Sequence, residues 1–483
     1  MGHGLKCGVA FSFCAVFAAY WYRQQVSNEL DSRLETVLSS LLKAERKVDL
    51  NRRPRVAVGF GGCLDIVTDG VTLLKKAGIK PSKNPVHHDY ITSEEQLAES
   101  FAYFFPPGAA SERFISNDTL FRKLVKATQG LPRVRWSLGG NAPVMANRLA
   151  KEGCEVLMGS RLTPDLIEVL QEHVTVTSKP VDETDIHLIL EYSTGTKWGK
   201  LVSRRANRFI VHHDSSNPIL ESLEDFQTQL QQFKPTLLII SGLQMMDNFP
   251  FRPEDAVAVH IGQLEERLRL LQDLMLSVDS TTGIHFEMAS FVDNGLLSNL
   301  FTYVITHVDS LGMNEQELPN LLSMLKGSNV TVLSDPYPRV ANILDQMRDV
   351  YRILNSQEIT STQRRLTRLH VHTLAFQAII IAKGSSWKNT MSATAKASLT
   401  ANRHVCGSPN IDTSKAKLIM DDSFSVSREQ GSKKIPLKEN RPVSCWEEYD
   451  YEICVAPVLV CTEVYQTVGG GDNVSAASLV LQI

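Results

Sequence analysis

The amino-acid sequence lacks several features that would assign it to a common class of protein. Its 50 Lys and Arg nearly balance its 53 Asp and Glu, for a formal net charge of -3, so no basic field indicates a nucleic-acid partner. No two cysteines are spaced as C-x-x-C, which disfavours a structural zinc site. The H-E-x-x-H, G-x-S-x-G and G-x-x-x-x-G-K-[ST] motifs are also absent, which disfavours zinc proteases, serine hydrolases and P-loop proteins.

The N-terminus is not globular in character. Residues 7–22 form a nearly continuous apolar run, with Lys6 before it and Arg23 behind it. The run is short for a membrane span and suits a signal peptide or a signal anchor. We therefore expect residues 1–23 to direct the chain into the secretory pathway, where it is lumenal or membrane-anchored in the endoplasmic reticulum, or secreted. Residues 24–53 are polar with apolar residues at helical spacing, and predict a stalk or a peripheral helix.

From residue 54 onward, short apolar runs alternate with amphipathic helical patterns. The runs lie at 55–60, 155–159, 186–191, 209–211, 237–240, 284–288 and 330–333, and the clearest helical patterns at 264–278 and 340–354. This alternation predicts an α/β fold with a mostly parallel sheet covered by helices. Residues from about 65 to 210 are more polar and contain prolines, as expected of an inserted lid domain.

A glycine-rich turn lies near the C-terminus. Gly469, Gly470, Gly471 and Asp472 follow the apolar run 456–460 and precede a helical pattern. Glycines let the backbone turn sharply and present bare N–H groups at a helix N-terminus, where an anion binds. A carboxylate there would repel a phosphate unless it has a chemical task, such as taking a proton from an attacking hydroxyl group. A flexible loop that ends in a capping Asp is the structural alternative.

Other polar residues follow the predicted strands and helices at positions where a ligand could bind. Asp65 follows the first strand, Gly140 and Asn141 open a helical pattern, and Glu191 ends another strand. Because ligands bind beyond the carboxyl ends of parallel strands, these residues could hydrogen-bond a polyol. As single residues, each could equally be a cap, a turn or a surface acid.

Two acidic motifs could hold a divalent cation. His285 and Glu287 point to the same face of a predicted strand. Asn314 and Glu317 begin a helix, where a capping box is the competing structural explanation. Two separate carboxylates near an anion site fit Mg²⁺, which proteins hold loosely through waters and substrate phosphates.

In combination, these motifs resemble one family, the ADP-dependent glucokinases of animals, which are related to archaeal ADP-dependent sugar kinases of ribokinase-like fold. The resemblance covers about residues 54–480. It is carried by the order and spacing of the segments HLILEY (187–192), ANRFI (206–210), SGLQMM (241–246), SLGMNEQEL (310–318) and PVLVC (457–461).

The resemblance implies a sugar kinase domain over residues 54–483 that transfers the terminal phosphate of ADP to the 6-hydroxyl of glucose with the help of Mg²⁺. The implied catalytic residues are Asp472 as general base, Gly469 and Gly471 at the phosphate, and Arg208 on the lid. The implied glucose contacts are Asp65, Gly140, Asn141 and Glu191. The implied nucleotide contacts are His370, His372, Val468 and Gly470. The implied metal-associated acids are Glu287, Glu317 and Asp472.

The resemblance further implies that Cys406 and Cys461 can pair beside the adenosine site. One departure concerns Gly61, which stands where archaeal members commonly have an Asn that contacts the sugar, and this bears on affinity more than on the reaction class. The alternatives are a related kinase with another sugar acceptor or with ATP as donor, and a catalytically weak, membrane-tethered binding protein. We expect a monomer.

Overall fold

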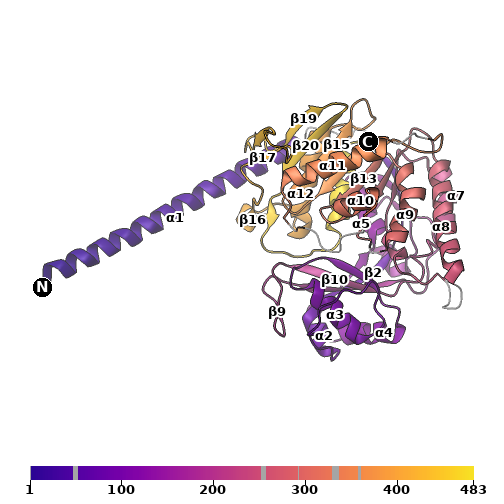
Figure 1. The fold of residues 1–483 in the computed structure, drawn as a ribbon, viewed down its shortest axis with the longest axis horizontal. Coiled ribbons are helices and arrows are strands. Elements are labelled where there is room, and N and C mark those ends of the chain that lie inside the picture. Colours follow the sequence, from indigo (N-terminus) through magenta and orange to yellow (C-terminus); the bar gives the residue numbers. More distant parts are fainter. Residues whose placement is uncertain are drawn as a thin grey trace.

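A computed structural model describes residues 2–46, 53–251, 257–291, 293–328, 335, 337–356 and 360–483. The strand expected at residues 330–333 lies outside the described residues. Figure 1 shows a large α/β domain, a smaller domain beside it and one long N-terminal helix that projects away from both.

A ten-stranded sheet forms the centre of the large domain, in the order β19-β20-β15-β14-β13-β12-β11-β1-β5-β6. The seven strands from β14 to β6 pair in parallel, and the other three are antiparallel, which confirms the mostly parallel sheet. The strands are β1 (Arg55–Gly59), β5 (Glu155–Gly159), β6 (Val174–Val176), β11 (Leu237–Ile240), β12 (Gly283–Glu287), β13 (Ser310–Asn314), β14 (Arg368–His372), β15 (Phe376–Ala382), β19 (Ser444–Glu448) and β20 (Tyr451–Pro457).

Helices cover both faces of this sheet because its central strands are apolar on both sides. Leu238 and Ile240 pack against helices α7 to α11, whereas Leu237 and Ile239 face α5, α12 and α13. The helices are α5 (Asn141–Lys151), α7 (Leu223–Phe233), α8 (Val257–Ser277), α9 (Asn294–Tyr303), α10 (Glu317–Leu325), α11 (Val340–Ser356), α12 (Thr390–Val405) and α13 (Gly470–Val480).

The smaller domain is a five-stranded sheet in the order β3-β10-β7-β2-β4, with three helices packed against it (Figure 1). Its elements are β2 (Cys63–Asp69), α2 (Gly70–Lys76), α3 (Glu94–Phe104), β3 (Ser111–Phe114), α4 (Asp118–Thr128), β4 (Arg135–Gly139), β7 (Ile186–Tyr192) and β10 (Asn207–His212). The lid is therefore built from two segments, because α5, β5 and β6 return to the large domain between them. The sequence predicted a lid inserted within about residues 65–210, and the lid strands occupy two parts of that region.

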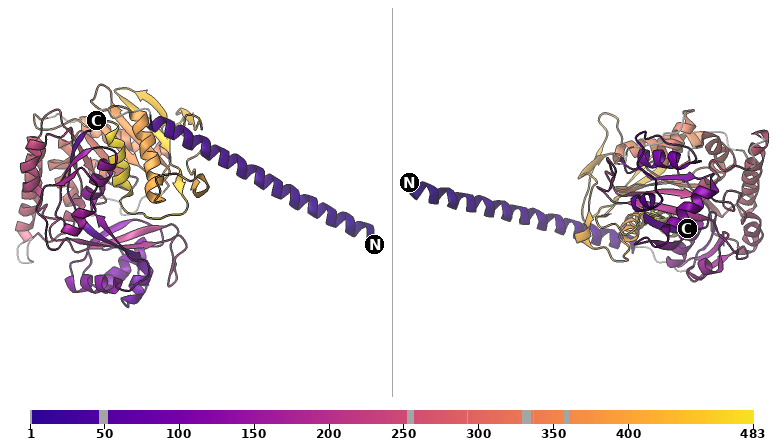
Figure 2. Two further views of the ribbon diagram at one scale, coloured as in Figure 1. Left: turned by 180° about the vertical axis from the view of Figure 1, so that it is seen from behind. Right: turned by 90° about the horizontal axis from the view of Figure 1, so that it is seen from below.

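The N-terminal helix α1 runs without a break from Gly2 to Glu45, so the apolar segment and the polar stalk form one rod (Figure 2). Aromatic side chains at its free half, such as Phe17 and Trp21, are exposed. Leu34, Val37 and Leu41 at the other half pack on the large domain beside α12. Within the part of the chain that the structure describes, no helix is both long and apolar enough to cross a membrane.

The remaining elements are short. They are α6 (Pro164–Glu168), β8 (Lys197–Trp198), β9 (Leu201–Val202), β16 (Ala416–Lys417), β17 (Ser423–Ser425), β18 (Lys434–Pro436), β21 (Val460–Cys461) and 3-10 turns at Leu243–Met246, Ile305–His307 and Thr413–Lys415.

Candidate active site

The glycine-rich turn forms the start of helix α13. Gly469 is the residue before the helix and has φ +67°, a backbone conformation that favours glycine. Asp472 lies within the first turn rather than before it. The first-turn N–H groups have no partner within their own helix, and together with the helix dipole they make this end attractive to an anion.

Gly471 allows close contact between α13 and strand β14. A Cβ atom at Gly471 would lie 2.8 Å from Cε1 of His372, whereas a Cβ atom at Gly470 would meet only Cδ2 of His404 at 3.9 Å. The structural reason for a glycine therefore differs between these two positions. Gly471 is required by packing, and Gly470 leaves space open at the helix start.

Asp472 is held in place by a hydrogen bond from Asn141. The Nδ2 atom of Asn141 donates to Oδ1 of Asp472 over 2.9 Å, and Oδ1 of Asn141 accepts from Nε2 of Gln244 over 2.8 Å. Burial, together with the negative charge of Glu287, raises the pKa of Asp472 to about 7. A carboxyl group with a pKa near neutrality is suited to general-base catalysis.

Gly140 brings Asn141 close to the first strand. It has φ +84°, and a Cβ atom there would lie 2.1 Å from the carbonyl oxygen of Gly61. Helix α5 can therefore begin directly against the glycines that follow β1. This close approach sets the position of Asn141 beside Asp472.

The two predicted acidic motifs lie on neighbouring strands, but their carboxylates differ. Glu287 accepts hydrogen bonds from Nε2 of His285 at 3.0 Å and Nε2 of His372 at 3.1 Å. Burial opposes ionisation of Glu287, yet these two imidazoles hold its pKa well below the ordinary value. Glu287 is consequently a carboxylate at neutral pH.

Glu317 caps its own helix. It accepts hydrogen bonds from the backbone N–H and the Nδ2 of Asn314, and Oδ1 of Asn314 accepts from the N–H of Glu317. These reciprocal bonds are those expected of a capping box, but they lie just ahead of α10, whose N-cap is Gln316 and not Asn314. Burial raises the pKa of Glu317 to about 8, with the nearby charge of Glu287 adding to the effect. A cation at this position would favour the ionised form.

The lid contributes Arg208 from strand β10. Its Nη1 reaches only Oδ1 of Asn207 at 3.4 Å, and its buried Nε has no hydrogen-bond partner among the described residues. The side chain of Arg208 is half-buried, and its buried Nε is an unused donor. A guanidinium with an unused donor indicates a binding position for an anion.

Asp65 belongs to a buried polar group in the lid sheet that also contains His187. Asp65 and His187 are partners on the adjacent strands β2 and β7, and burial raises the pKa of Asp65 to about 6. The Nε2 of His187 lies 3.0 Å from Asp214, and its Nδ1 lies 3.4 Å from Glu112. Burial opposes protonation of His187, but the charge of Asp214 raises its pKa well above the ordinary value.

Two members of this group, His187 and Glu112, were not singled out as site residues from the sequence. The pairing of β2 with β7 places His187 opposite Asp65, and that register emerges only in the folded sheet. Glu112 and Gln244 line a small hollow between the lid and the large domain, together with His212. The alternation of strand residues 186–192 was the one signal that could have identified His187 as an inward-facing residue.

Glu191 lies at the contact between the lid and the loop before Gly469. Its carboxylate accepts hydrogen bonds from Nη2 of Arg135 at 2.8 Å and from the N–H and hydroxyl groups of Thr467 at 3.2 and 3.0 Å. Its described partners are these residues and not Asn141 or Asp472. Its position therefore indicates a role in holding the lid against the large domain, in contrast to the direct sugar contact implied by the resemblance.

The two histidines implied as nucleotide contacts, His370 and His372, differ in how deeply they are buried. His372 faces Glu287 and Gly471, as described above. His370 has no exposed surface, and its ring nitrogens meet Gln377 at 3.1 Å and Ser478 of α13 at 3.4 Å. In this structure His370 therefore supports α13 and presents no surface to a nucleotide.

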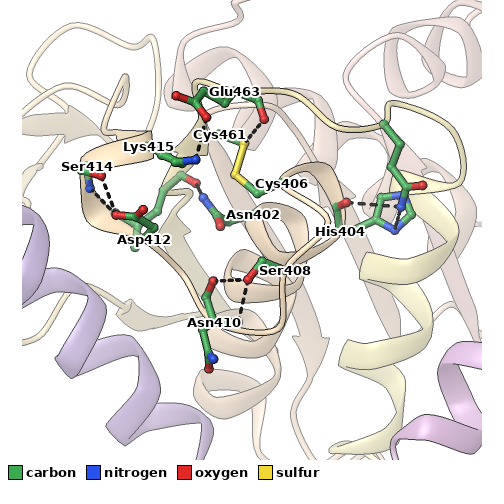
Figure 3. Close-up of a disulfide and its surroundings, with 12 residues drawn as sticks. Asn402, His404, Cys406, Ser408, Asn410, Asp412, Ser414, Lys415, Cys461 and Glu463 are labelled. Carbon is green, nitrogen blue, oxygen red and sulfur yellow. Dashed lines mark hydrogen bonds and ion pairs between the residues drawn. A yellow bond between two sulfur atoms is a disulfide. The ribbon is translucent and has the colours of Figure 1, made fainter. Parts of the chain in front are cut away.

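A disulfide supports the loop that leads into α13. Cys406 at the end of α12 is bonded to Cys461 of β21, and Figure 3 shows His404 and Asn402 near this bond. The Nε2 of His404 lies 2.6 Å from the carbonyl oxygen of Val468, the residue before Gly469. The implied Cys406–Cys461 pair is therefore present. A second disulfide, Cys445–Cys454, was not predicted and joins β19 to β20.

A larger cleft, of about 530 Å³, lies at the opposite ends of the strands, beside Trp387 and the start of α12. It contains none of the groups described above. The reactive groups instead lie where the lid covers the carboxyl ends of the parallel strands, as expected for an α/β sheet.

The fold and the site together define a class of protein. A helix N-terminus suited to an anion, a near-neutral carboxyl group within it and a lid arginine with an unused donor are the parts needed to move a phosphoryl group onto a hydroxyl group. The protein is a phosphotransferase of the α/β kinase type.

Comparison with known proteins identifies the family. Residues 54–481 match the model of the ADP-specific phosphofructokinase/glucokinase conserved region, and the chain belongs to this family. It is 34% identical over 433 residues to the ADP-dependent glucokinase of Bos taurus, which covers 88% of this chain and 84% of that protein. It is 27% identical to a probable ADP-dependent glucokinase of Caenorhabditis elegans, covering 95% of this chain and 92% of that one.

Solved structures of related kinases share the fold. An ADP-dependent kinase in complex with fructose 6-phosphate and ADPβS superimposes with a TM-score of 0.65 at 18% identity, covering 94% of this chain and 97% of that chain. A hypothetical ADP-dependent phosphofructokinase from Pyrococcus horikoshii OT3 gives a TM-score of 0.59 at 17% identity, covering 90% and 98%. The α/β fold expected from the sequence is confirmed.

Proposed function

We propose that this protein is an ADP-dependent glucokinase, which transfers the terminal phosphate of ADP to the 6-hydroxyl of D-glucose and releases glucose 6-phosphate and AMP. The observation that carries the proposal is the position of Asp472, half-buried in the first turn of α13 and hydrogen-bonded to Asn141, where desolvation raises its pKa to about 7. The family and the bovine relative named above support the choice of ADP and glucose.

Each group has a distinct part in the reaction. Asp472 accepts the proton of the attacking hydroxyl group late in the transfer. The first-turn N–H groups of α13 and the guanidinium of Arg208 stabilise the negative charge on the transferred phosphoryl oxygens. Asp65 and Asn141 provide the acceptors and donors that a polyol needs, and the lid excludes water from the reacting groups.

Donor and acceptor choice is tested with the purified protein in a matrix of assays. ADP or ATP is offered with glucose, glucosamine, fructose 6-phosphate or mannose, and the products are separated and quantified. We expect glucose 6-phosphate and AMP from glucose with ADP, and at least about tenfold lower kcat/KM for every other pair. Preference for ATP or for another acceptor would replace the proposal by a related sugar kinase. Binding of glucose without turnover would indicate a binding protein.

We further propose that Mg²⁺ takes part, associated with Glu287 and Glu317 and close to Asp472. The residues fit such an ion because two buried carboxyl groups, Glu287 and Glu317, and the half-buried Asp472 gather here, and the charge of Glu287 contributes to the raised pKa values of Glu317 and Asp472. When bound, the ion would neutralise charge on the phosphate oxygens. We expect Glu317→Gln to raise the Mg²⁺ concentration for half-maximal activity by about tenfold or more. An unchanged Mg²⁺ requirement would restrict Glu317 to helix capping.

We also propose that the N-terminal segment directs the chain into the secretory pathway and tethers it there, and that the enzyme acts as a monomer. The apolar run, the exposed aromatic residues on the free half of α1 and the two disulfides support an oxidising compartment. Protease protection of the full-length chain in microsomes, with and without detergent, tests the location. Digestion in the absence of detergent would contradict it.

A further inference from the structure

A continuous set of polar contacts joins the N-terminal helix to the catalytic turn. It begins at Glu45, the last residue of α1. The carboxylate of Glu45 accepts hydrogen bonds from Nη1 and Nη2 of Arg403 at 2.7 and 3.0 Å and from Nζ of Lys396 at 3.2 Å. Arg403 and Lys396 both belong to α12, so the end of α1 is fixed to that helix by two cations.

The contacts continue from α12 through α5 to α13. Lys396 also lies 2.7 Å from Oε2 of Glu152, and Glu152 pairs with Arg148 at 3.4 Å. The Nε of Arg148 donates to Oδ1 of Asn473 over 2.9 Å, and Nδ2 of Asn473 donates to the carbonyl oxygen of Gly469 over 2.8 Å. The contacts end at Asn473 and Gly469, which lie on either side of Asp472 in the same turn, and Asn473 directly follows Asp472 in the chain.

A second branch reaches the same turn through the end of α12. Arg403, which binds Glu45, directly precedes His404, and His404 contacts the carbonyl oxygen of Val468 at 2.6 Å. Cys406, which forms the disulfide with Cys461, lies two residues after His404 (Figure 3). Both branches therefore end within residues 468–473.

Docking of α1 alone does not account for these charged residues. Leu34, Val37 and Leu41 already bury an apolar stripe of α1 against the large domain. Glu45 and Lys396 have side chains that are only 12% and 11% exposed, and burying charged groups costs free energy that apolar residues would avoid. A costly ionic network is retained more readily when it fixes a geometry than when it only adds stability, and here it ends in the turn that carries Asp472.

We propose that Glu45 is a positioning residue for catalysis, and that α1 is thereby part of the catalytic unit as well as the N-terminal extension of the chain. Glu45 holds Lys396 and Arg403 in place. Without it, Lys396 is free to draw Glu152 away from Arg148, which releases Asn473 and loosens the turn that carries Asp472. The effect on turnover rests on the proposed kinase function, whereas the effect on the turn does not.

The test compares Glu45→Gln with Arg33→Gln in the full-length protein. Arg33 is the matched control because it also fastens α1 to the large domain, through Asp422 and Glu439, but contacts neither α12 nor α5. Two quantities are measured for each variant. These are kcat and KM with glucose and ADP, and the rate of backbone hydrogen exchange in residues 466–473.

We expect Glu45→Gln to lower kcat by about 5- to 20-fold with a change in glucose KM of less than about twofold, since small misplacement of a reacting group is costly. Exchange at 466–473 should become faster. Arg33→Gln should keep both near wild-type values, with any loss confined to thermal stability. Glu152→Gln should mimic Glu45→Gln, and the double variant Glu45→Gln/Glu152→Gln should be no worse than either single one, since both changes interrupt the same contacts.

Three results would overturn the inference. One is wild-type kcat or wild-type exchange in Glu45→Gln. Another is equal loss in Arg33→Gln, which would reduce Glu45 to a docking contact. The third is additive loss in the double variant. If Glu45→Gln does not fold, Glu152→Gln decides, because it leaves the contacts of α1 with Arg403 intact. If the wild-type protein shows no turnover with glucose and ADP, the proposed function fails, and hydrogen exchange alone decides the positioning role.

Discussion

Asp472 shows how a single residue acquires its chemistry from its surroundings. Burial raises its pKa to about 7, from an ordinary value near 4 for an exposed Asp. The raised value means that the folded state binds the proton more tightly than the unfolded state. The stabilising effect of this proton is therefore present at low pH and is lost as pH rises through about 7.

Replacement of Asp472 by Asn should consequently stabilise the protein at alkaline pH. The uncharged amide keeps the shape of the side chain and removes a buried carboxylate that costs free energy above pH 7. We expect Asp472→Asn to melt at a higher temperature than wild type at pH 8, with a smaller difference at pH 5.5. Thermal unfolding at both pH values checks this. A lower melting temperature at pH 8 would contradict the burial argument.

The glycines at the start of α13 were recognised from the sequence, but their separate reasons were not. The pattern indicated a turn and an anion site, whereas the contact between Gly471 and His372 depends on the packing of α13 against β14. The same limit applies to Cys445 and Cys454, which face each other only because of the register between β19 and β20. Local sequence predicts where an element begins, and the partners of its side chains come from the assembled sheet.

At the scale of this helix, two substitutions to Ala should have opposite effects on stability. Ala at 471 places a Cβ atom 2.8 Å from the ring of His372, and we expect a loss of about 1–3 kcal/mol from overpacking. Ala at 470 has room, and we expect a gain of up to about 1 kcal/mol because Ala favours helix more than Gly. Chemical unfolding of both variants measures the two free energies. Equal effects would show that the contact between α13 and β14 is not tight.

At the scale of the whole molecule, Arg135 and Glu191 of the lid contact the loop that precedes α13. Arg135 of β4 donates to the carbonyl oxygen of Tyr465 at 3.0 Å, and its guanidinium lies over the ring of Tyr465. Its bond of 2.8 Å to Glu191 stays within the lid and orients the carboxylate that accepts from Thr467. These contacts connect the lid to the loop that leads to Gly469. Closure of the lid and the position of the catalytic turn are therefore linked.

Removal of Arg135 should open the molecule in the absence of ligands. We expect Arg135→Ala to increase the radius of gyration in small-angle X-ray scattering and to raise the KM for glucose, while saturating glucose and AMP restore the compact form. Arg122→Ala is the control, because Arg122 is exposed and, among the described residues, forms its ion pair with Asp118 one turn earlier in α4. Identical scattering curves for Arg135→Ala and wild type would show that other contacts close the lid.

The sequence predicted the large domain well and the lid only in outline. Strands β1, β5 and β11 were placed within one residue, because continuous apolar runs bounded by Gly, Pro or Ser are strong local signals. The lid sheet joins residues 63–69 to segments around 135 and 186, and no local pattern specifies pairings over such separations. Asp65 and Asn141 could be predicted because each lies close to glycines that are visible in the local sequence. His187 and Glu112 could not, because their place in the site depends on these long-range pairings.

The central claim is that Asp472 is the general base of a phosphoryl transfer from ADP to glucose. The most direct measurement is the turnover of glucose and ADP by Asp472→Asn, together with the affinity of that variant for glucose by calorimetry. We expect kcat to fall by at least about 10²-fold while glucose affinity stays nearly unchanged. A variant that keeps more than about a tenth of the wild-type activity would contradict the assignment of Asp472.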